Sequence, residues 1–310
     1  MAALEATSAC KKTTRSDPWR RWSGALVLVA FLAALLSGCS KAQESWFTRV
    51  AEARRVASDL RVQFNKAADA SNRSVMADTD DASIAYAAEA VQAREAIHRD
   101  AEALVPLLEA LDYRAEMQHL EDFRRSFEEY EKMDRAILLL AVENTNLKAQ
   151  KLAFGPERAA ADDFAAAMGA FLRATSAKSS CKAAAVGFGA AAALREIQSL
   201  EAPHISEPDE AAMTRMERQM DELEASVRSA LSELSSLADA TTSRHLAAAN
   251  AALERFNQIR GTIIALSRKN TNVRSLALSL GDKRKVVSAC DSSLAALQDK
   301  LAHEKLSATR

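Results

Sequence analysis

The sequence predicts an all-α protein built from long antiparallel up-and-down helices. Aromatic residues make up only 5% of the chain, and its 310 residues include 8 glycines and 5 prolines. Apolar residues recur three or four positions apart over long stretches, as they do along one face of a helix. One such stretch recurs 126 residues further along the chain. We therefore expect two duplicated units of four helices each.

The first predicted element is a leader peptide over residues 1–38. Basic residues precede an uncharged apolar segment at 25–36, and small residues follow it, which is the order of a secretory signal. The apolar segment is about a dozen residues long, whereas a membrane span needs about 20. The basic residues are Lys11, Lys12, Arg15, Arg20 and Arg21.

The leader ends in Leu36-Ser37-Gly38-Cys39. This ending resembles the lipobox of bacterial lipoproteins, which implies that Cys39 is acylated, for example with palmitate, and becomes the first mature residue. In that family, serine at the next position, here Ser40, implies release to the outer membrane. We therefore expect a lipid-anchored protein on the periplasmic face. A plain cleaved signal, an uncleaved anchor and a twin-arginine signal at Arg20-Arg21 are the alternatives.

The expected mature chain is close to neutral. The leader accounts for five of the 41 basic and two of the 42 acidic residues, which leaves 36 against 40 and a formal charge of −4. This balance gives no electrostatic basis for binding nucleic acid. No membrane-spanning segment is expected after residue 39, so the membrane contact is the lipid anchor.

Helix-breaking residues divide the mature chain into eight predicted helices. The first unit is expected at 39–178 and the second at 179–310, each running up, down, up, down. Ser206 and Asp209 suggest a capping box, and Pro106 is expected to kink the second helix. The predicted breaks lie near 71–81, at Asp112-Tyr113, at Gly155-Pro156, at 176–180, at 203–208, at 238–242 and at Gly281-Asp282.

The third and seventh helices carry the repeated apolar stripe. Each is expected to be one rod of about 40 residues, or about 60 Å. The stripe positions of the third helix are Leu120, Phe123, Phe127, Tyr130, Met133, Ile137, Leu140, Asn144 and Leu147, and those of the seventh are Leu246, Ala249, Leu253, Phe256, Ile259, Ile263, Leu266, Asn270 and Val273.

Two cysteines follow Cys39, in a compartment that permits disulfides. The helix pattern places Cys181 and Cys290 about 30 Å apart, beyond the reach of a disulfide. Cys290 falls at a core position of the repeat, which favours a buried thiol.

Two long runs resemble the last two helices of the four-helix-bundle sensor domains of bacterial chemoreceptors: "EYEKMDRAILLLAVENTNLKAQKLAFGPERAAADDFAAAM" and "ERFNQIRGTIIALSRKNTNVRSLALSLGDKRKVVSACDSSL". The resemblance implies an extracytoplasmic bundle that binds a small molecule or a partner between its helices and relays a shift. The second membrane span and the signalling helices of that family are not expected here, so sensing would require a membrane-crossing partner.

The repeated Asn-Thr-Asn at 144–146 and 270–272 is the sharpest local feature. Its first asparagines lie on the apolar stripes, where an amide needs hydrogen-bond partners. The paired amides and the basic residues one turn later either hold a carboxylate ligand, or set helix register and favour helix C-termini. The candidate ligand-binding residues are Asn144, Asn146, Lys148, Asn270, Asn272 and Arg274.

Other motifs have ordinary structural explanations. Two Glu-x-x-His pairs have the spacing of di-iron bundles but lie about 12 Å apart along the bundle axis, and a row of methionines continues as a core stripe. No nucleophile elbow, phosphate loop or zinc spacing is present, so no catalytic residue, metal site or cofactor is predicted. The motifs are Glu95-x-x-His98, Glu116-x-x-His119, and Met213 with Met216 and Met220.

These observations predict a non-enzymatic, lipid-anchored helical module that binds a small molecule or an envelope protein partner. The alternative is a structural envelope adaptor or spacer that binds no small molecule. A polar-lined gap near Asn144 or Asn270 would favour the first function, and a solid bundle would favour the second.

Overall fold

The computed structural model describes residues 19–176 and 180–303, with side chains from residue 45 onward. All regular secondary structure in these ranges is helical, which confirms the all-α fold. Most of the predicted leader and the side chain of Cys39 lie outside the described residues. Among the residues that are described, no helix is long and apolar enough to cross a membrane.

Ten α-helices and one π-helical turn make up the described chain. They are α1 (Trp19–Met76), α2 (Asp80–Ala110), α3 (Arg114–Glu143), α4 (Thr145–Leu152), η1 (Ala153–Glu157), α5 (Arg158–Ala174), α6 (Ser180–Ser206), α7 (Glu210–Ser235), α8 (Ser243–Lys269), α9 (Thr271–Leu280) and α10 (Asp282–His303).

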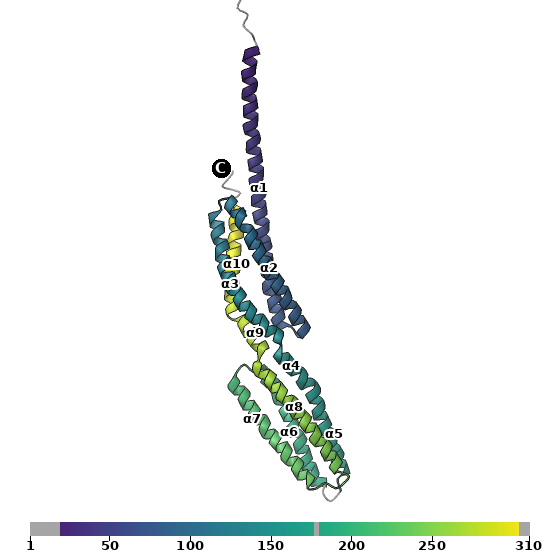
Figure 1. The fold of residues 1–310 in the computed structure, drawn as a ribbon. Coiled ribbons are helices and arrows are strands. Elements are labelled where there is room, and N and C mark those ends of the chain that lie inside the picture. The colour runs from purple at the N-terminus through teal and green to yellow at the C-terminus, as the bar shows by residue number, and fades with distance from the viewer. Residues whose placement is uncertain (1–18, 177–179, 304–310) are drawn as a thin grey trace, which may run out of the picture.

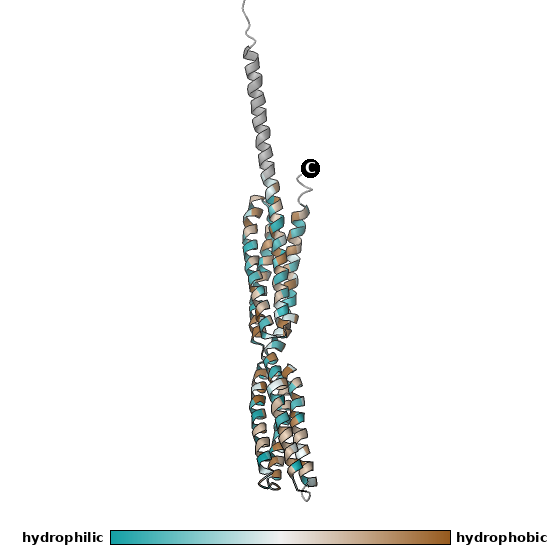
Figure 2. Ribbon diagram, turned by 90° about the vertical axis from the view of Figure 1, so that its right-hand side faces the viewer, coloured by the Kyte–Doolittle hydropathy of each residue, from teal (hydrophilic) through white to brown (hydrophobic). Residues whose placement is uncertain are grey.

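The helices form two bundles that stand end to end (Figure 1). The upper bundle contains the C-terminal part of α1 with α2, α3 and α10, and the lower bundle contains α5, α6, α7 and α8. The short helices α4 and α9 join the two bundles at a narrow junction, which is also visible from the side (Figure 2). The N-terminal part of α1 projects beyond the upper bundle.

The four helices of each bundle are not consecutive in the chain. Helix α5 packs on α6 and α8, and α10 packs on α3 and α1. Each bundle therefore takes its last helix from the other half of the sequence. The helices are grouped differently from the two continuous units expected at 39–178 and 179–310.

The predicted turn at Gly155-Pro156 does not form, and this allows the exchange. The chain passes through these residues in the π-helical turn η1 and continues straight into α5. Proline lacks a backbone N–H, and a π-turn changes the local hydrogen-bond pattern. At the corresponding place in the second half, α9 ends at Leu280 and α10 begins at Asp282, with only Gly281 between them.

The two predicted 40-residue rods are each interrupted once. Helix α3 ends before Asn144 and α8 ends before Asn270, and both asparagines have left-handed backbone dihedrals. Other boundaries differ less. Helix α1 extends through residues 71–76, and Asp209 alone caps α7 by accepting a hydrogen bond from Ala212 N at 2.7 Å.

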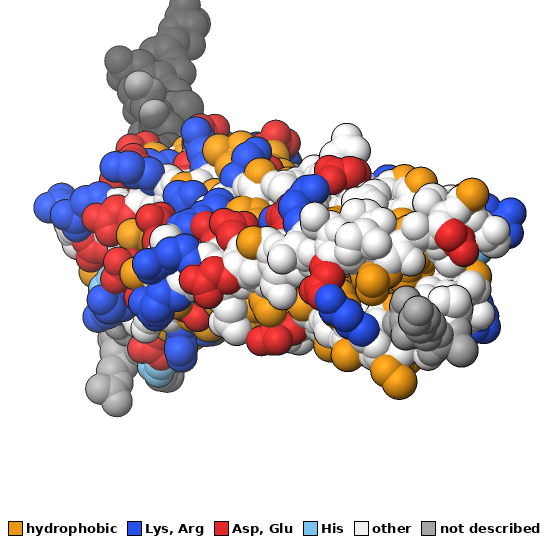
Figure 3. All heavy atoms as spheres, turned by 90° about the horizontal axis from the view of Figure 1, so that it is seen from below, with side chains coloured by type: hydrophobic (Ala, Val, Ile, Leu, Met, Phe, Trp, Pro, Cys, Tyr) orange, Lys and Arg blue, Asp and Glu red, His pale blue; other side chains and the backbone are white. Residues whose placement is uncertain are grey.

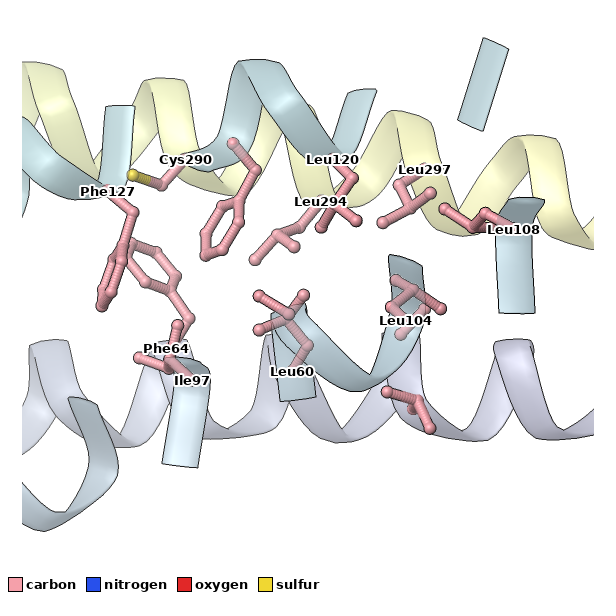
Figure 4. Packing of buried hydrophobic residues seen from close by; sticks show 14 of the residues in the cluster. Leu60, Phe64, Ile97, Leu104, Leu108, Leu120, Phe127, Cys290, Leu294 and Leu297 are labelled. Atoms are coloured by element: carbon pink, nitrogen blue, oxygen red, sulfur yellow. The ribbon is translucent and has the colours of Figure 1, made fainter. Parts of the chain in front are cut away.

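Aromatic side chains fill the upper core. The Phe64 ring is fully buried and lies edge-on to Phe123, Phe127 and Tyr130, with ring centroids 5.5–6.3 Å apart. Figure 4 shows the surrounding leucines, which come from α1, α2, α3 and α10. Such pairs contribute more than their buried area alone, so this core fixes the four-helix packing.

The two cysteines lie in different bundles and are both free thiols. Cys181 is exposed at the start of α6, whereas Cys290 is buried in the upper core beside Phe127 (Figure 4). Burial raises the pKa of the Cys290 thiol to about 12. This agrees with the buried, unbridged cysteine that its core position predicts.

Small residues line much of the lower core. Figure 2 shows hydrophilic and hydrophobic residues mixed along the helices of the lower bundle. A Cβ atom at Gly187 would lie 3.1 Å from Met168 Sδ, so this glycine allows α5 and α6 to approach closely. The alanines of this core are Ala160, Ala161, Ala183, Ala190, Ala193, Ala249 and Ala252.

Candidate functional site

The candidate site begins where the two long helical paths cross between the bundles. Asn144 has φ 51° and ψ 41°, and Asn270 has φ 54° and ψ 38°. Asparagine enters this left-handed region more readily than most residues. Each asparagine thus ends one helix and begins the next without a longer loop.

Residues that are 126 positions apart pair with each other at this crossing. The backbone N–H of Thr145 donates to Thr271 Oγ1, and that of Thr271 donates to Thr145 Oγ1, both at 3.1 Å. In the same way, Asn146 N donates to Asn272 Oδ1 at 3.1 Å and Asn272 N donates to Asn146 Oδ1 at 3.0 Å. The first N–H groups of α4 and α9 lack acceptors within their own helices. Side chains at the start of the other helix accept these hydrogen bonds.

The amide nitrogens bind across the crossing as well. Asn146 Nδ2 donates to Asn270 Oδ1 at 2.7 Å, and Asn272 Nδ2 donates to Asn144 Oδ1 at 2.9 Å. Asn146 Nδ2 also donates to the Ile205 carbonyl at the end of α6. The crossing therefore connects α4 and α9 to each other and to the lower bundle.

The six predicted ligand residues are only partly brought together. The four asparagines meet at the crossing, whereas Lys148 Nζ donates to the Glu143 carbonyl at 2.7 Å and Arg274 is exposed. In the described structure, Asn144 Nδ2 is buried without a hydrogen-bond partner. None of the six lines either of the two cavities described below. This geometry matches the register-setting interpretation of the motif.

The upper bundle contains a buried charge cluster that the sequence motifs do not reveal. Asp134 is fully buried and pairs with Arg94 at 2.6 Å and with Lys283 at 3.0 Å. Lys283 Nζ also donates to Ser71 Oγ. Burial lowers the pKa of Lys283, and the charge of Asp134 opposes this shift. The cluster joins α2, α3 and α10 through two basic side chains that share one carboxylate.

A polar cavity of about 530 Å³ opens beside this cluster, between α1 and the α9–α10 segment. Its acidic lining residue, Asp291, pairs with Arg61 at 3.0 Å. Basic and neutral polar groups dominate the lining. The polar lining residues are Arg61, Asn65, Asn72, Ser279, Lys283, Arg284, Ser288 and Asp291.

At two of the positions related by 126 residues, the lower bundle carries an ionisable residue of the opposite type. Arg260 corresponds to Asp134, and Glu157 corresponds to Lys283. Arg260 is buried and pairs with Glu224 of α7. The lower bundle thus has a base where the upper one has Asp134, and an acid where the upper one has Lys283.

Glu157 and Glu201 form a buried carboxyl pair beside Arg260. Glu157 is 0% exposed and Glu201 is 2% exposed. In the described structure, both carboxyl oxygens of Glu157 and Oε1 of Glu201 accept no hydrogen bond from another residue, and the two carboxyl groups are hydrogen-bonded to each other. Burial, and then the neighbouring Glu201 carboxyl, raises the pKa of Glu157 far above its usual range. Burial also raises the pKa of Glu201. Both shifts favour the protonated form of the carboxyl groups in the folded protein.

The charge pattern matches the exchanged packing of the last helices. In the observed arrangement, Asp134 of α3 meets Lys283 of α10, and the charge of Arg260 acts on Glu157. If each last helix packed within its own half at the same register, Asp134 would face Glu157 and Arg260 would face Lys283. Buried like charges without partners are strongly destabilising. The buried charges thus oppose the unexchanged arrangement.

A Ser–His–Glu sequence of contacts joins α6, α7 and α8. His204 Nδ1 lies 2.9 Å from Ser267 Oγ, and His204 Nε2 lies 2.8 Å from Glu217 Oε1. Ser267 is fully buried, and its hydroxyl donates to the His204 carbonyl at 2.9 Å. A buried hydroxyl that already donates to the backbone is not presented to a substrate, so this network ties helices together.

The other predicted motifs lie in structural surroundings. His98 pairs with Glu131 at 3.1 Å and packs against Phe127, and Met213 and Met220 are buried. Within the described ranges, no group of three or more His, Cys, Asp or Glu side chains is arranged to hold a metal ion.

Taken together, the fold defines an all-α protein of two stacked bundles that share two long helical paths. A comparison with protein-family models finds no family that matches the chain. A search of curated proteins finds no significant match either.

Asn144→Ala is expected to destabilise the protein by about 1 kcal/mol more than Asn144→Gly. Both variants lose the hydrogen bond from Asn272, but only alanine must pay the cost of about 1–2 kcal/mol for a left-handed backbone. Urea unfolding followed by circular dichroism measures the difference. Equal stability of the two variants would contradict the role of the left-handed asparagine.

Glu157→Gln is expected to remove a loss of stability that develops as pH rises from about 4.5 to about 11. The folded pKa of Glu157 is raised above its usual value of 4.5, so its contribution to stability is fully present below that value and is lost as pH rises. Glutamine imitates the protonated form. The free energy of unfolding of the variant should therefore exceed that of the wild type increasingly with pH, by at most about 1.4 kcal/mol per pH unit.

The control for this measurement is Glu196→Gln, which changes an exposed glutamate of the neighbouring helix α6. Its stability should follow the wild type at every pH. A Glu157→Gln profile parallel to that of the wild type would show that Glu157 ionises normally in the folded protein.

Proposed function

We propose that the protein is a lipid-anchored module of the bacterial outer membrane, facing the periplasm, that binds a small anionic molecule or a partner protein. It acts as a sensor-like domain without its own transmitter and passes a change in helix packing to an envelope partner. The observation that carries the proposal is the polar cavity between α1 and the α9–α10 segment, beside the buried Lys283.

The chemistry of this cavity suits an anion. Arg284 is exposed and contributes to the cavity lining. The guanidinium of Arg61 forms an ion pair with Asp291 and donates a hydrogen bond to Gln298. Asparagine amides and serine hydroxyls of the lining supply neutral hydrogen-bond donors. A small carboxylate or phosphate would meet both charge and directed donors there.

The position of the cavity supports a relay. Its walls are α1, which leads towards the predicted lipid anchor, and the α9–α10 segment, which begins at the Asn270 crossing. A ligand that binds better when these walls are closer shifts the population towards that arrangement. The crossing would pass the shift to α8 and the lower bundle.

The alternative function is a structural adaptor or spacer that binds no small molecule. The dense hydrogen bonding at the crossing favours it, because a stiff junction suits a rod-like spacer. Nucleic acid is not the expected partner. On the face shown in Figure 3, acidic and basic side chains are interspersed and do not form a basic patch.

The anchor is tested by Cys39→Ser. The wild-type protein, expressed in a bacterium with labelled palmitate, should incorporate the label and fractionate with the outer membrane, because acyl chains hold it there. The serine variant should lose both properties. Cys181→Ser is the control and should retain them. A wild-type protein that carries no label would refute the lipid anchor.

Binding is tested by a thermal-shift screen of the full-length protein in detergent against small carboxylates and phosphates. A ligand at about 100 times its dissociation constant should stabilise the folded state by about 2.7 kcal/mol. Arg61→Gln and Arg284→Gln should abolish this shift. Lys285→Gln removes an exposed charge outside the cavity lining and should not.

If no anion shifts the melting curve of the wild type, the adaptor function gains support over sensing. If anions stabilise the wild type and both cavity variants equally, they bind elsewhere and the proposed cavity is wrong.

A further inference from the structure

Helix α9 has polar residues on its inner side and apolar residues on its outer side. It lies at the narrow junction between the bundles (Figure 1). One of its buried serines, Ser279, donates to Asn72 Oδ1 of α1 at 3.0 Å. The buried residues of α9 are Thr271, Ser275 and Ser279, and its exposed residues include Leu276, Ala277, Leu278 and Leu280. Helices at the surface of a soluble protein show the opposite pattern, so the outer side of α9 is not an ordinary solvated face.

The outer residues of α9 form one continuous stripe. Four of them are spaced i, i+3, i+4 and i+7 and therefore share one face of the helix. They are Val273, Leu276, Ala277 and Leu280, and we call them the α9 stripe. Val273 is partly exposed and the other three are exposed, Leu280 to 60%. An apolar face with this spacing is suited to bind a second helix.

Two further exposed apolar side chains lie at the height of the stripe. Met76 of α1 and Leu139 of α3 are each 71% exposed. Met76 comes four residues after Asn72, which contacts α9. Leu139 comes five residues after Asp134, which contacts the start of α10. At 1.5 Å per residue, both lie about 6–8 Å closer to the crossing than those contacts. Five of the eleven large apolar side chains that are exposed within the described residues therefore lie at one height of the molecule.

In the first half of the chain, polar residues interrupt the corresponding face. Gln150 and Lys151, both exposed, occupy the two central stripe positions 126 residues earlier. Phe154, the counterpart of Leu280, borders a cavity of about 310 Å³ in the lower bundle, between the η1–α5 segment and α6, which also has Glu201 in its lining. The first helical path thus passes through the junction without a continuous apolar outer face, so the junction itself does not require the α9 stripe.

Basic residues flank the α9 stripe at both ends. Residues 268–285 contain six basic residues and one acidic residue, whereas the corresponding residues 142–159 contain three basic and two acidic residues. Arg274 and Arg284 are exposed and form no ion pair within the described part of the chain. The six basic residues are Arg268, Lys269, Arg274, Lys283, Arg284 and Lys285. A partner that complements this surface has an apolar helix face flanked by carboxylates.

A second copy of the chain and a membrane surface both fit the stripe poorly. Helix α9 is ten residues or about 15 Å long, and a stable interface buries about 800 Å² on each partner. Because both ends of the stripe are basic, a two-fold pair of copies brings like charges together in either helix orientation. Met76, at the height of the stripe, lies about 55 Å along α1 from Cys39, so a lipid anchor there holds the stripe away from the membrane.

We propose that the α9 stripe is the docking site for an amphipathic helix of a partner protein, with apolar residues three and four positions apart and Asp or Glu on either side. The inference rests on the part of the proposed function that gives the protein an envelope partner, and it needs neither the lipid anchor nor the anion cavity. A helix on the stripe lies outside α9, which packs on α3, α1 and α4. Its binding therefore acts on the segment that joins the two bundles.

The test is fluorescence anisotropy with labelled helical peptides of about 16 residues and the full-length protein in detergent. The probe has leucines at i, i+3, i+4 and i+7 and glutamates in the flanking positions. One control peptide carries lysine in place of every glutamate, and the other carries serine in place of every leucine. The glutamate probe should bind at least about tenfold more tightly than either control, because apolar burial and charge attraction both contribute.

Variants of α9 locate the binding. Leu276→Gln combined with Ala277→Lys gives α9 the outer residues of the first half and should weaken the probe about tenfold or more. Leu280→Ser should act in the same direction. All three positions are exposed, so folding is preserved. Phe154→Ser changes the equivalent exposed position of the first half and should bind like the wild type. Arg274→Gln should reduce both the affinity and its dependence on salt.

Labelling of the Leu280→Cys variant with a membrane-impermeant maleimide distinguishes the three occupants. The glutamate probe should slow the labelling, whereas a higher protein concentration or reconstitution in phosphatidylglycerol liposomes should not. The exposed native Cys181 of the lower bundle is the internal reference. Protection at high protein concentration would assign the stripe to a second copy, and protection in liposomes would assign it to the membrane. Either result overturns the proposal.

The proposal also fails if the lysine peptide binds as tightly as the glutamate probe, or if the α9 variants bind the probe like the wild type. Arg61→Gln, which tests the anion cavity, should leave peptide binding unchanged, and Leu280→Ser should leave the anion-induced thermal shift unchanged. Failure of the anion cavity is therefore distinguishable from failure of this docking site, and both are distinguishable from failure of the anchor at Cys39.

Discussion

The reciprocal hydrogen bonds between Thr145–Asn146 and Thr271–Asn272 hold the two long helical paths where they pass from one bundle to the other. Helix N-termini leave backbone N–H groups without partners, and a buried end needs them satisfied from elsewhere. Here each path satisfies the other. Because the asparagines before them take left-handed backbones, the chain changes direction within one residue and remains helical on both sides. The exchange of the last helices between bundles depends on this junction.

The buried charges give the exchange its specificity. Asp134 and Lys283 meet across α3 and α10, whereas Arg260 and Glu157 occupy the equivalent positions below with reversed sign. A buried ion pair adds little net stability, but a buried charge beside a like charge is strongly unfavourable. Apolar stripes alone would accept either partner helix, since they are alike in both halves. The charges discriminate between the two arrangements that the stripes permit.

Each bundle has a cavity with a buried ionisable residue in its lining, a base in the upper bundle and an acid in the lower bundle. The upper cavity is lined by the buried Lys283 together with other basic and neutral polar residues, and the lower cavity has the buried Glu201 in its lining. Both cavities are bordered by helices of the two shared paths, so a change in either bundle acts on the crossing between them. In the proposed sensor-like function, occupancy of a cavity in one bundle would bias the helix packing of the other.

Periodicity and composition determined the helical class, the Asp112 hairpin and the core stripes, because each follows from local spacing and turn chemistry. The same signals identified Asn144 and Asn270 as polar positions needing partners. They could not reveal which helix packs against which, since Gly155-Pro156 is compatible with either a turn or a straight π-helical passage. Only the tertiary structure decided that choice. The asparagine and threonine hydrogen bonds between the two segments join residues 124 to 128 positions apart, and Asp134 and Lys283 are further apart still in the chain. Contacts of that separation leave no trace in local sequence pattern.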